Sequence, residues 1–187
     1  IEENMEAMKE HLRPGTKMYG VVKTDAYGHG AVPVARTIDR FVCGYAVATV
    51  DEGLKLRRHG IEKEILCLGP VSAGRYQECL ENDISLPFFE YRRAKELSDA
   101  AAAEGKTAKI HIAVDTGMSR IGLFPDEGSV ETVKEIAELP ALRIAGMFTH
   151  FARADEADKT NAAISLPRIF LMDSPLSFKR SFSPNQA

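Results

Sequence analysis

The chain has 187 residues, with 24 Lys and Arg against 27 Asp and Glu, so its formal net charge is −3. With 44% hydrophobic and 27% charged residues it has the composition of one globular domain. The near-neutral charge balance excludes a basic stripe for nucleic acid, and no apolar run reaches the ~18 residues of a membrane span. Three cysteines without a CxxC spacing indicate neither a disulfide framework nor a zinc knuckle, so we expect a cytoplasmic protein.

Helical and strand-like patterns alternate along the chain. The first helix is predicted before Pro14 and Gly15, where apolar residues recur at helical spacing: Ile1, Met5, Met8 and Leu12. Short apolar runs predict strands at 18–22, 43–48, 64–68, 84–89, 109–114 and 142–149. Between them, helices are predicted at 31–40, 50–59, 72–81, 91–104 and 129–139.

Local chemistry supports several of these boundaries. Thr49 followed by Glu52 is the pattern of a capping box, and Gly60 and Gly105 stand where left-handed helix caps belong. The strand starts recur about every 20 to 33 residues, which is typical of βα units with a parallel sheet. A doubly wound sheet and a (β/α)₈ barrel both satisfy this pattern, although a closed barrel needs eight strands and six are found.

The stretch VVKTDAYGHG, residues 21–30, carries the clearest chemical signal. A buried strand that ends in a lysine is unusual, because a charge there is costly unless it is paired or used. Parallel α/β folds bind their ligands at the carboxyl ends of the strands, where Lys23 is expected. A partly desolvated lysine loses its proton more readily and can form a Schiff base with a carbonyl compound. The alternative is a strand-end lysine that merely extends to solvent.

The same stretch closely resembles the lysine motif of the alanine racemases, a family of fold-type III enzymes that bind pyridoxal 5′-phosphate. Other segments resemble that family in the same order: AVATVDEGLKLRRHGI (46–61), ILCLGP (65–70), ENDISLPFF (81–89), HIAVDTGMSRIG (111–122) and FTHFARADEADK (148–159). The resemblance implies an α/β fold, a (β/α)₈ barrel of the TIM type with about six βα units recognisable. It assigns residues 1–160 to this barrel, leaves 161–187 as an atypical tail, and finds nothing like the family's C-terminal β domain.

The resemblance also implies roles for four residues. Lys23 would hold the cofactor as an internal aldimine and act as the base on one face of the substrate α-carbon. Tyr27 would lie beside the cofactor phosphate, Arg120 near the phenolic oxygen and the substrate, and His150 against the ring. From the residues alone, Arg120 could equally belong to a surface salt bridge, and His150 could be a hydrogen-bonded histidine at a strand end.

Departures from the family qualify this expectation. The period of a strand places His111, Ala113 and Asp115 on one face, and Ala113 stands where alanine racemases commonly carry a lysine that steadies the arginine. Racemisation needs a base on each face of the substrate α-carbon. The family takes its second base, a tyrosine, from the C-terminal domain of the partner subunit, and that domain is not recognisable here.

The resemblance thus predicts a homodimeric racemase of the isomerase class, acting most simply on alanine, with serine or a broader range left open. Such an enzyme supplies D-alanine as a peptidoglycan precursor, and this chain could be a truncated form that is weakly active or inactive. One alternative is a non-catalytic protein that binds pyridoxal phosphate or a protein partner. A second is a metal-dependent barrel that uses strand-end residues: His29, His111, His150, Asp25 and Asp115.

Overall fold

The computed structural model describes residues 1–153 and residue 157 of the chain. In this part the strands form one six-stranded parallel sheet in the order of the sequence. The strands are β1 (Met18–Val21), β2 (Val42–Val47), β3 (Glu64–Cys67), β4 (Ile84–Phe88), β5 (Ala108–Val114) and β6 (Leu142–Thr149). The predicted tail, residues 161–187, lies outside the described residues.

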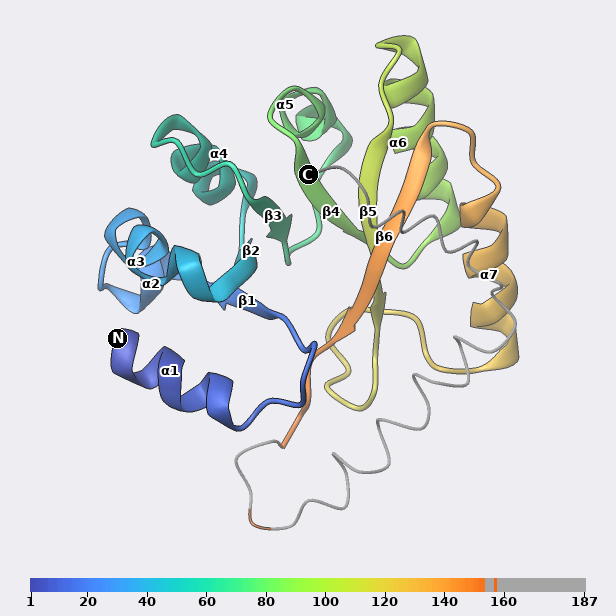
Figure 1. Ribbon diagram of the computed structural model, residues 1–187. Helices are drawn as coiled ribbons and strands as arrows, with labels where there is room; N and C mark the ends of the chain where they lie inside the picture. Colours follow the sequence, from blue (N-terminus) through green and yellow to red (C-terminus); the bar gives the residue numbers. More distant parts are fainter. Residues whose placement is uncertain (154–156, 158–187) are drawn as a thin grey trace.

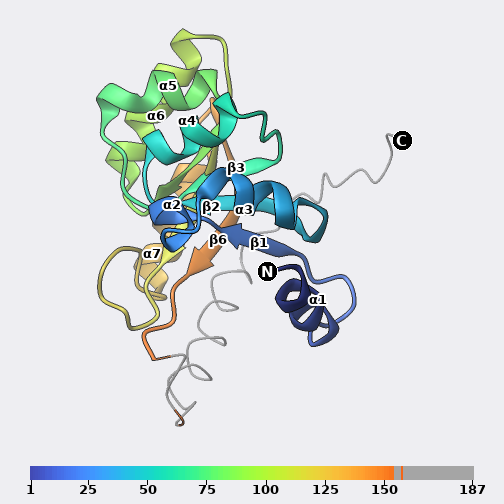
Figure 2. The same cartoon turned by 90° about the vertical axis from the view of Figure 1, so that its left-hand side faces the viewer.

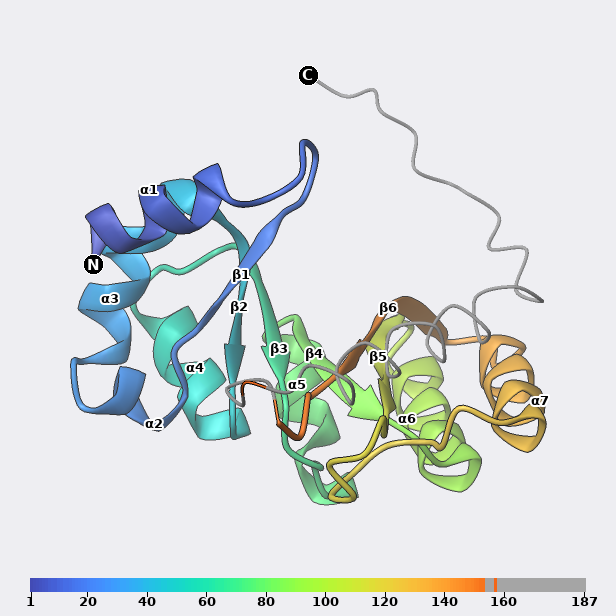
Figure 3. The ribbon, with the colours of Figure 1, turned by 90° about the horizontal axis from the view of Figure 1, so that it is seen from below.

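Helices connect successive strands. They are α1 (Glu2–Glu10), α2 (Lys23–Tyr27), α3 (Ala31–Ile38), α4 (Val50–Arg58), α5 (Tyr76–Glu81), α6 (Tyr91–Ala103) and α7 (Glu127–Ala137), with short 3₁₀ turns η1 (Asp39–Phe41) and η2 (Ala73–Arg75). Helices α3 to α7 lie in an arc around the outside of the curled sheet (Figure 1). Helix α1 packs beside α3 at the β1 end (Figures 2 and 3).

The strand order identifies the architecture. A doubly wound sheet reverses its strand order and carries helices on both faces, whereas here β1 to β6 follow one another and the connecting helices cover one face. The structure is therefore a curled half-barrel of the TIM type, with six parallel strands of which β1 to β5 are each followed by a helix. This confirms the predicted incomplete (β/α)₈ barrel and excludes the doubly wound alternative. Among the described residues, β1 and β6 each pair with a neighbour on one side only.

The two faces of the sheet differ in burial. On the convex face, strand side chains such as Tyr45, Ile65 and Ile110 are fully buried against the helices. Each such side chain contributes about 1.5–3 kcal/mol by its removal from water. On the concave face of β1, Tyr19 and Val21 remain 38% and 48% exposed. The hydrophobic core therefore lies between the sheet and the helices, and the concave face is exposed at β1.

Most predicted boundaries agree with the structure to within a residue or two. The Thr49 and Glu52 capping box is present at the start of α4, and Gly60 and Gly105 have positive φ angles of +80° and +64° after their helices. The helix predicted at 72–81 consists of η2 followed by α5. Helix α2 was not predicted. No helix within the described part of the chain is long and apolar enough to cross a membrane.

Candidate functional site

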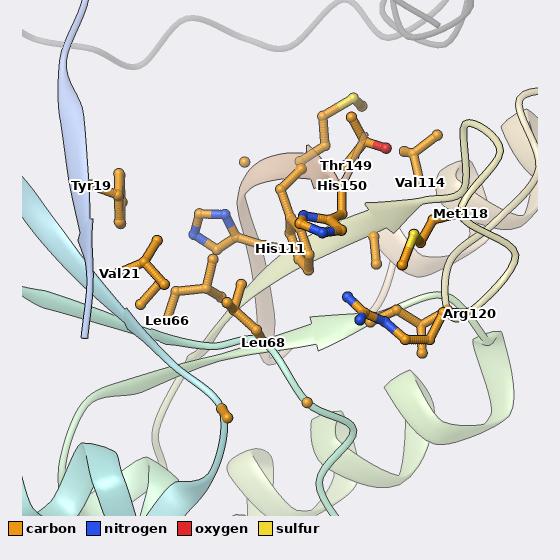
Figure 4. A pocket seen from close by; sticks show the side chains of 18 of the residues that line it. Tyr19, Val21, Leu66, Leu68, His111, Val114, Met118, Arg120, Thr149 and His150 are labelled. Atoms are coloured by element: carbon orange, nitrogen blue, oxygen red, sulfur yellow. The ribbon is translucent and has the colours of Figure 1, made fainter. Parts of the chain in front are cut away.

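A cavity of about 840 Å³ occupies the concave face of the sheet. Tyr19 and Val21 line it from β1, and Met118, Arg120 and His150 lie on the opposite side (Figure 4). Its walls are mainly apolar, and they include alternate residues of the intervening strands: Ala46, Ala48, Leu66 and Leu68. A cavity of this size accommodates a small-molecule cofactor together with a small substrate.

The alternation of β1 places Lys23 at this cavity. Tyr19, Val21 and Lys23 line it, whereas Gly20 faces the helices, where an added Cβ would lie 2.6 Å from Cδ1 of Ile38. Lys23 directly follows the strand at its carboxyl end, which is the end of a parallel sheet where ligands bind. The position predicted for Lys23 from the sequence is thus the position that the structure gives it.

The chain makes an unusual turn directly after Lys23. Thr24, Asp25, Ala26 and Tyr27 have φ angles of +54°, +51°, +52° and +54°, so that four successive residues with side chains adopt the left-handed helical conformation. The left-handed conformation costs roughly 1–2 kcal/mol for each such residue. A turn of this kind persists only where surrounding contacts hold it, and such strained segments concentrate at functional sites.

Two carboxylates hold the turn. Oδ1 of Asp25 accepts hydrogen bonds from the backbone N–H of Ala31 at 2.9 Å and from Nζ of Lys55 at 2.8 Å. The Ala31 hydrogen bond, with the Lys55 contact after it, lowers the pKa of Asp25. Glu52 accepts the backbone N–H of Thr24 at 2.5 Å and that of Ala48 at 2.6 Å. Helix α4, which carries Glu52 and Lys55, therefore braces the turn.

Tyr27 ends this turn and, unlike the other predicted site residues, does not line the cavity. Its ring centroid lies 5.9 Å from Nζ of Lys23, and its side chain is exposed and outside the set of residues that line the cavity. The structure thus brings Lys23, Arg120 and His150 to one cavity and places Tyr27 at its edge, next to Lys23.

The loop after β5 carries Arg120. Oδ1 of the buried Asp115 accepts the backbone N–H groups of Gly117 at 2.9 Å and Ser119 at 3.0 Å, which curls the loop around this carboxylate. Gly122 then lets the chain return against β5, because an added Cβ would lie 2.6 Å from the backbone nitrogen of Asp115. Arg120 is presented to the cavity from the loop held in this way.

His150 directly follows β6 and reaches the same cavity. Its loop is tied to the Arg120 loop by a 2.8 Å hydrogen bond between the hydroxyl groups of Thr116 and Thr149. Ala113 also lines the cavity, so the position where the family commonly has a lysine offers no charged group to Arg120 here. Arg120 and His150 are thirty residues apart in the sequence, and the pairing of β5 with β6 brings them to the same cavity.

A polar layer lies at the amino-terminal side of the concave face. Glu64 accepts hydrogen bonds from Nε2 of His111 at 3.0 Å, from the hydroxyl of Ser85 at 2.9 Å and from the hydroxyl of Tyr19. The His111 hydrogen bond, followed by those of Tyr19 and Ser85, outweighs burial and lowers the pKa of Glu64 to about 2. Burial first, and then the Glu64 hydrogen bond, raises the pKa of Tyr19.

Glycines make room for this layer. Gly44 separates Tyr19 from Glu64, and a Cβ there would lie 2.7 Å from the Tyr19 ring; a Cβ at Gly146 would lie 3.1 Å from the His111 ring. Large side chains thus come from β1, β3 and β5, with small residues on the strands between, as in the layers of a TIM barrel. Sequence reasoning missed Tyr19 and Glu64, because their partners are distant in sequence.

The metal-dependent alternative receives no geometric support. His111 is paired with Glu64, Asp25 with Lys55, and Nδ1 of His29 lies 3.0 Å from the carbonyl oxygen of Ala26. Within residues 1–153 and 157, no group of three His, Cys, Asp or Glu side chains is arranged to hold a metal ion.

Comparison with known proteins agrees with this architecture. The family model described as alanine racemase, N-terminal domain, matches residues 1–170. An alanine racemase of Clostridium novyi is 47% identical over 167 residues, which cover 89% of this chain and 43% of that protein. An alanine racemase of Syntrophobacter fumaroxidans is 40% identical over 171 residues, or 90% of this chain and 45% of that protein.

Solved structures give the same result. The alanine racemase of Clostridium difficile 630 superposes with a TM-score of 0.90 at 36% identity, over 94% of this chain and 46% of that one. A histidine racemase of Leuconostoc mesenteroides superposes with a TM-score of 0.81 at 28% identity, over 89% and 45%. The chain spans less than half the length of each of these relatives. By its sequence and its fold, the chain belongs to the alanine racemase family.

Proposed function

We propose that this chain forms the cofactor-binding barrel of an amino-acid racemase that interconverts L- and D-alanine. The observation that carries the proposal is that Lys23, Arg120 and His150 line the same cavity. Family membership and the alanine racemases among its relatives support the same activity. Alanine is favoured over histidine because most of the similar proteins cited above act on alanine by name.

The residues of the site fit pyridoxal 5′-phosphate. An aldehyde cofactor needs a primary amine, which Lys23 provides at the cavity wall. Among the residues that the structure describes, the Lys, Arg and Asp side chains that line the cavity are Lys23, Arg120 and Asp115, and the carboxylate of Asp115 accepts backbone N–H groups of its own loop. An anionic ring with a phosphate and a phenolic oxygen therefore meets a cationic lining with apolar walls. When bound, this cofactor supplies an electron sink for the α-carbanion of an amino acid.

Each residue then has a distinct task. Lys23 holds the cofactor through its amine and moves the proton at the α-carbon of the substrate on one face. Arg120 would hold the phenolic oxygen and the substrate carboxylate, since a planar guanidinium fixes both direction and charge. His150 would hold the cofactor ring, and Tyr27, beside Lys23, would hold the phosphate.

Racemisation requires a second base on the opposite face. We assign it to a tyrosine of a partner subunit, as the resemblance to the family implies, and therefore propose a homodimer. In this proposal residues 1–160 are the barrel unit and 161–187 a separate tail, and the protein works in the cytoplasm, where D-alanine is made for peptidoglycan.

The exchange of the alanine α-proton tests this function. The full chain with pyridoxal phosphate is incubated with L-alanine in D₂O, and loss of the α-proton signal is followed by ¹H NMR, with formation of D-alanine measured in parallel. We expect exchange that the Lys23→Arg variant abolishes, because arginine forms no Schiff base. Exchange without D-alanine would show that Lys23 works on one face and the second base is absent, which supports the role of Lys23. Absence of exchange in a chain that binds the cofactor would instead support a non-catalytic binding protein.

A further inference from the structure

The left-handed turn after Lys23 is held by a contact that the helix capping pattern does not require. Glu52 belongs to the capping box of α4, which requires its carboxylate to accept only the backbone N–H of Thr49, at 3.2 Å. The same carboxylate accepts the backbone N–H of Ala48 at 2.6 Å through Oε2 and that of Thr24 at 2.5 Å through Oε1. Glu52 therefore joins the carboxyl ends of β1 and β2.

The Thr24 contact acts directly on Lys23. The N–H of Thr24 belongs to the peptide bond that follows Lys23, so its orientation sets the ψ angle of Lys23 and thereby the direction in which the lysine side chain leaves the backbone. The residues from Thr24 to Tyr27 hold a conformation that L-amino acids disfavour. Without an external acceptor for the Thr24 N–H, the turn has less to hold it in the left-handed region.

The ion pair between Asp25 and Lys55 is weaker than the Glu52 contact. The Asp25 and Lys55 side chains are 52% and 47% exposed, and an exposed ion pair contributes little to stability. Glu52 is partly buried and accepts three backbone N–H groups, two of them at 2.6 Å or less. Charged acceptors of short hydrogen bonds form the stronger class of these interactions. Asp25 also ties the turn to the N–H of Ala31 at 2.9 Å, whereas Glu52 contacts the N–H directly after Lys23.

We propose that Glu52 is a positioning residue that fixes the peptide bond between Lys23 and Thr24 and so directs the Lys23 amine into the cavity. This inference rests on the proposed function of Lys23. Glu52 lies outside the residues that line the cavity and acts through the backbone of the turn, not on the cofactor or the substrate. The Glu52 carboxylate has two roles, to cap α4 and to orient the Lys23 side chain, and substitutions can separate these roles.

Two variants of the full chain make this separation. Glu52→Gln keeps one acceptor oxygen and places an NH₂ group against either Thr24 or the end of β2, so one set of N–H groups loses its acceptor. Thr49→Ala removes the hydroxyl that accepts the N–H of Glu52 at 3.3 Å, and leaves the Glu52 carboxylate with Thr24 and Ala48. Thr49→Ala is thus a matched control for loss of the helix cap alone.

The first readout needs no cofactor. Hydrogen–deuterium exchange of the ligand-free chain, followed by mass spectrometry, measures protection of the peptide that contains residues 22–28. We expect exchange about tenfold faster or more in Glu52→Gln and unchanged in Thr49→Ala, since a hydrogen bond to a charged acceptor is lost in the first variant only. Equal protection in Glu52→Gln and the wild-type chain, or equal loss in both variants, would overturn the proposal.

The second readout is spectroscopic. The chain is titrated with pyridoxal phosphate, and Schiff-base formation is followed by its visible absorbance. We expect the apparent dissociation constant to rise about tenfold in Glu52→Gln and to stay within twofold of the wild type in Thr49→Ala. A wild-type affinity in Glu52→Gln would refute the effect on Lys23. If the wild-type chain forms no Schiff base, the proposed function fails, while the exchange experiment still decides whether Glu52 holds the turn.

Discussion

Replacement of Glu64 by glutamine tests whether the polar layer is a stabilising element of the half-barrel. The His111, Tyr19 and Ser85 contacts lower the pKa of Glu64 from its ordinary value of 4.5 to about 2. At 1.36 kcal/mol for each unit, the ionised form gains about 3 kcal/mol from folding, which is an upper bound for this group. The side chain is 27% exposed, so solvent screens only part of this gain.

Glutamine keeps one acceptor oxygen and loses the charge, so we expect Glu64→Gln to lower the free energy of unfolding by about 2 kcal/mol at pH 7. Urea unfolding followed by far-UV circular dichroism measures this difference. Glu62→Gln is the matched control, since Glu62 is exposed and two residues away, and it should change stability by less than about 0.5 kcal/mol. A Glu64→Gln chain as stable as the control would refute the reasoning.

Three further predictions follow from the same structure. Because the folded pKa of Glu64 lies below its unfolded value, the stabilisation by Glu64 is complete above about pH 4.5 and is lost as the pH falls towards 2. A ¹³C NMR titration of the Glu64 carboxyl should give a midpoint near 2. A midpoint near 4.5 would contradict the hydrogen bonds of the polar layer. Gly122→Ala should lower the free energy of unfolding in urea by about 1–3 kcal/mol, since the φ of +120° disfavours alanine and the added Cβ would lie 2.6 Å from the backbone nitrogen of Asp115. Wild-type stability would show that the loop can adopt a different conformation at no cost. Tyr45→Phe removes a buried hydroxyl whose single proton is shared between two acceptors, the Asp39 carboxylate and the Ala35 carbonyl, each 2.7 Å away. We expect a loss of about 1–3 kcal/mol in thermal or urea unfolding, and no change would mean that these contacts are not made in solution.

The sequence predicted the strands and helices well where the signal is local. Each strand is a short apolar run, and the capping box of α4 lies within four adjacent residues, Thr49 to Glu52. Lys23 was placed correctly because a charge at the end of an apolar strand stands out by itself. The spacing of βα units predicted a parallel sheet but left its strand order open, and the order that the structure shows decided between the barrel and the doubly wound sheet.

The features that were missed depend on distant partners. Of the residues from Thr24 to Tyr27 only Asp25 is of a type that adopts the left-handed conformation readily, and the acceptor of the Thr24 N–H, Glu52, is 28 residues away. Glu64 is separated by 45 residues from Tyr19 and by 47 from His111. His111 was therefore considered as a metal ligand, whereas the fold pairs it with a carboxylate. Only the register of the sheet brings these side chains into one layer.

The covalent state of Lys23 tests the central claim most directly. The full chain is incubated with pyridoxal phosphate, reduced with borohydride, and examined by intact-mass and peptide-mapping mass spectrometry, with Lys23→Arg as the control. We predict one phosphopyridoxyl group, located on the peptide that contains Lys23 and absent from the variant. Adducts scattered over surface lysines, or an equal yield from the variant, would contradict the assignment of Lys23 as the cofactor-binding residue.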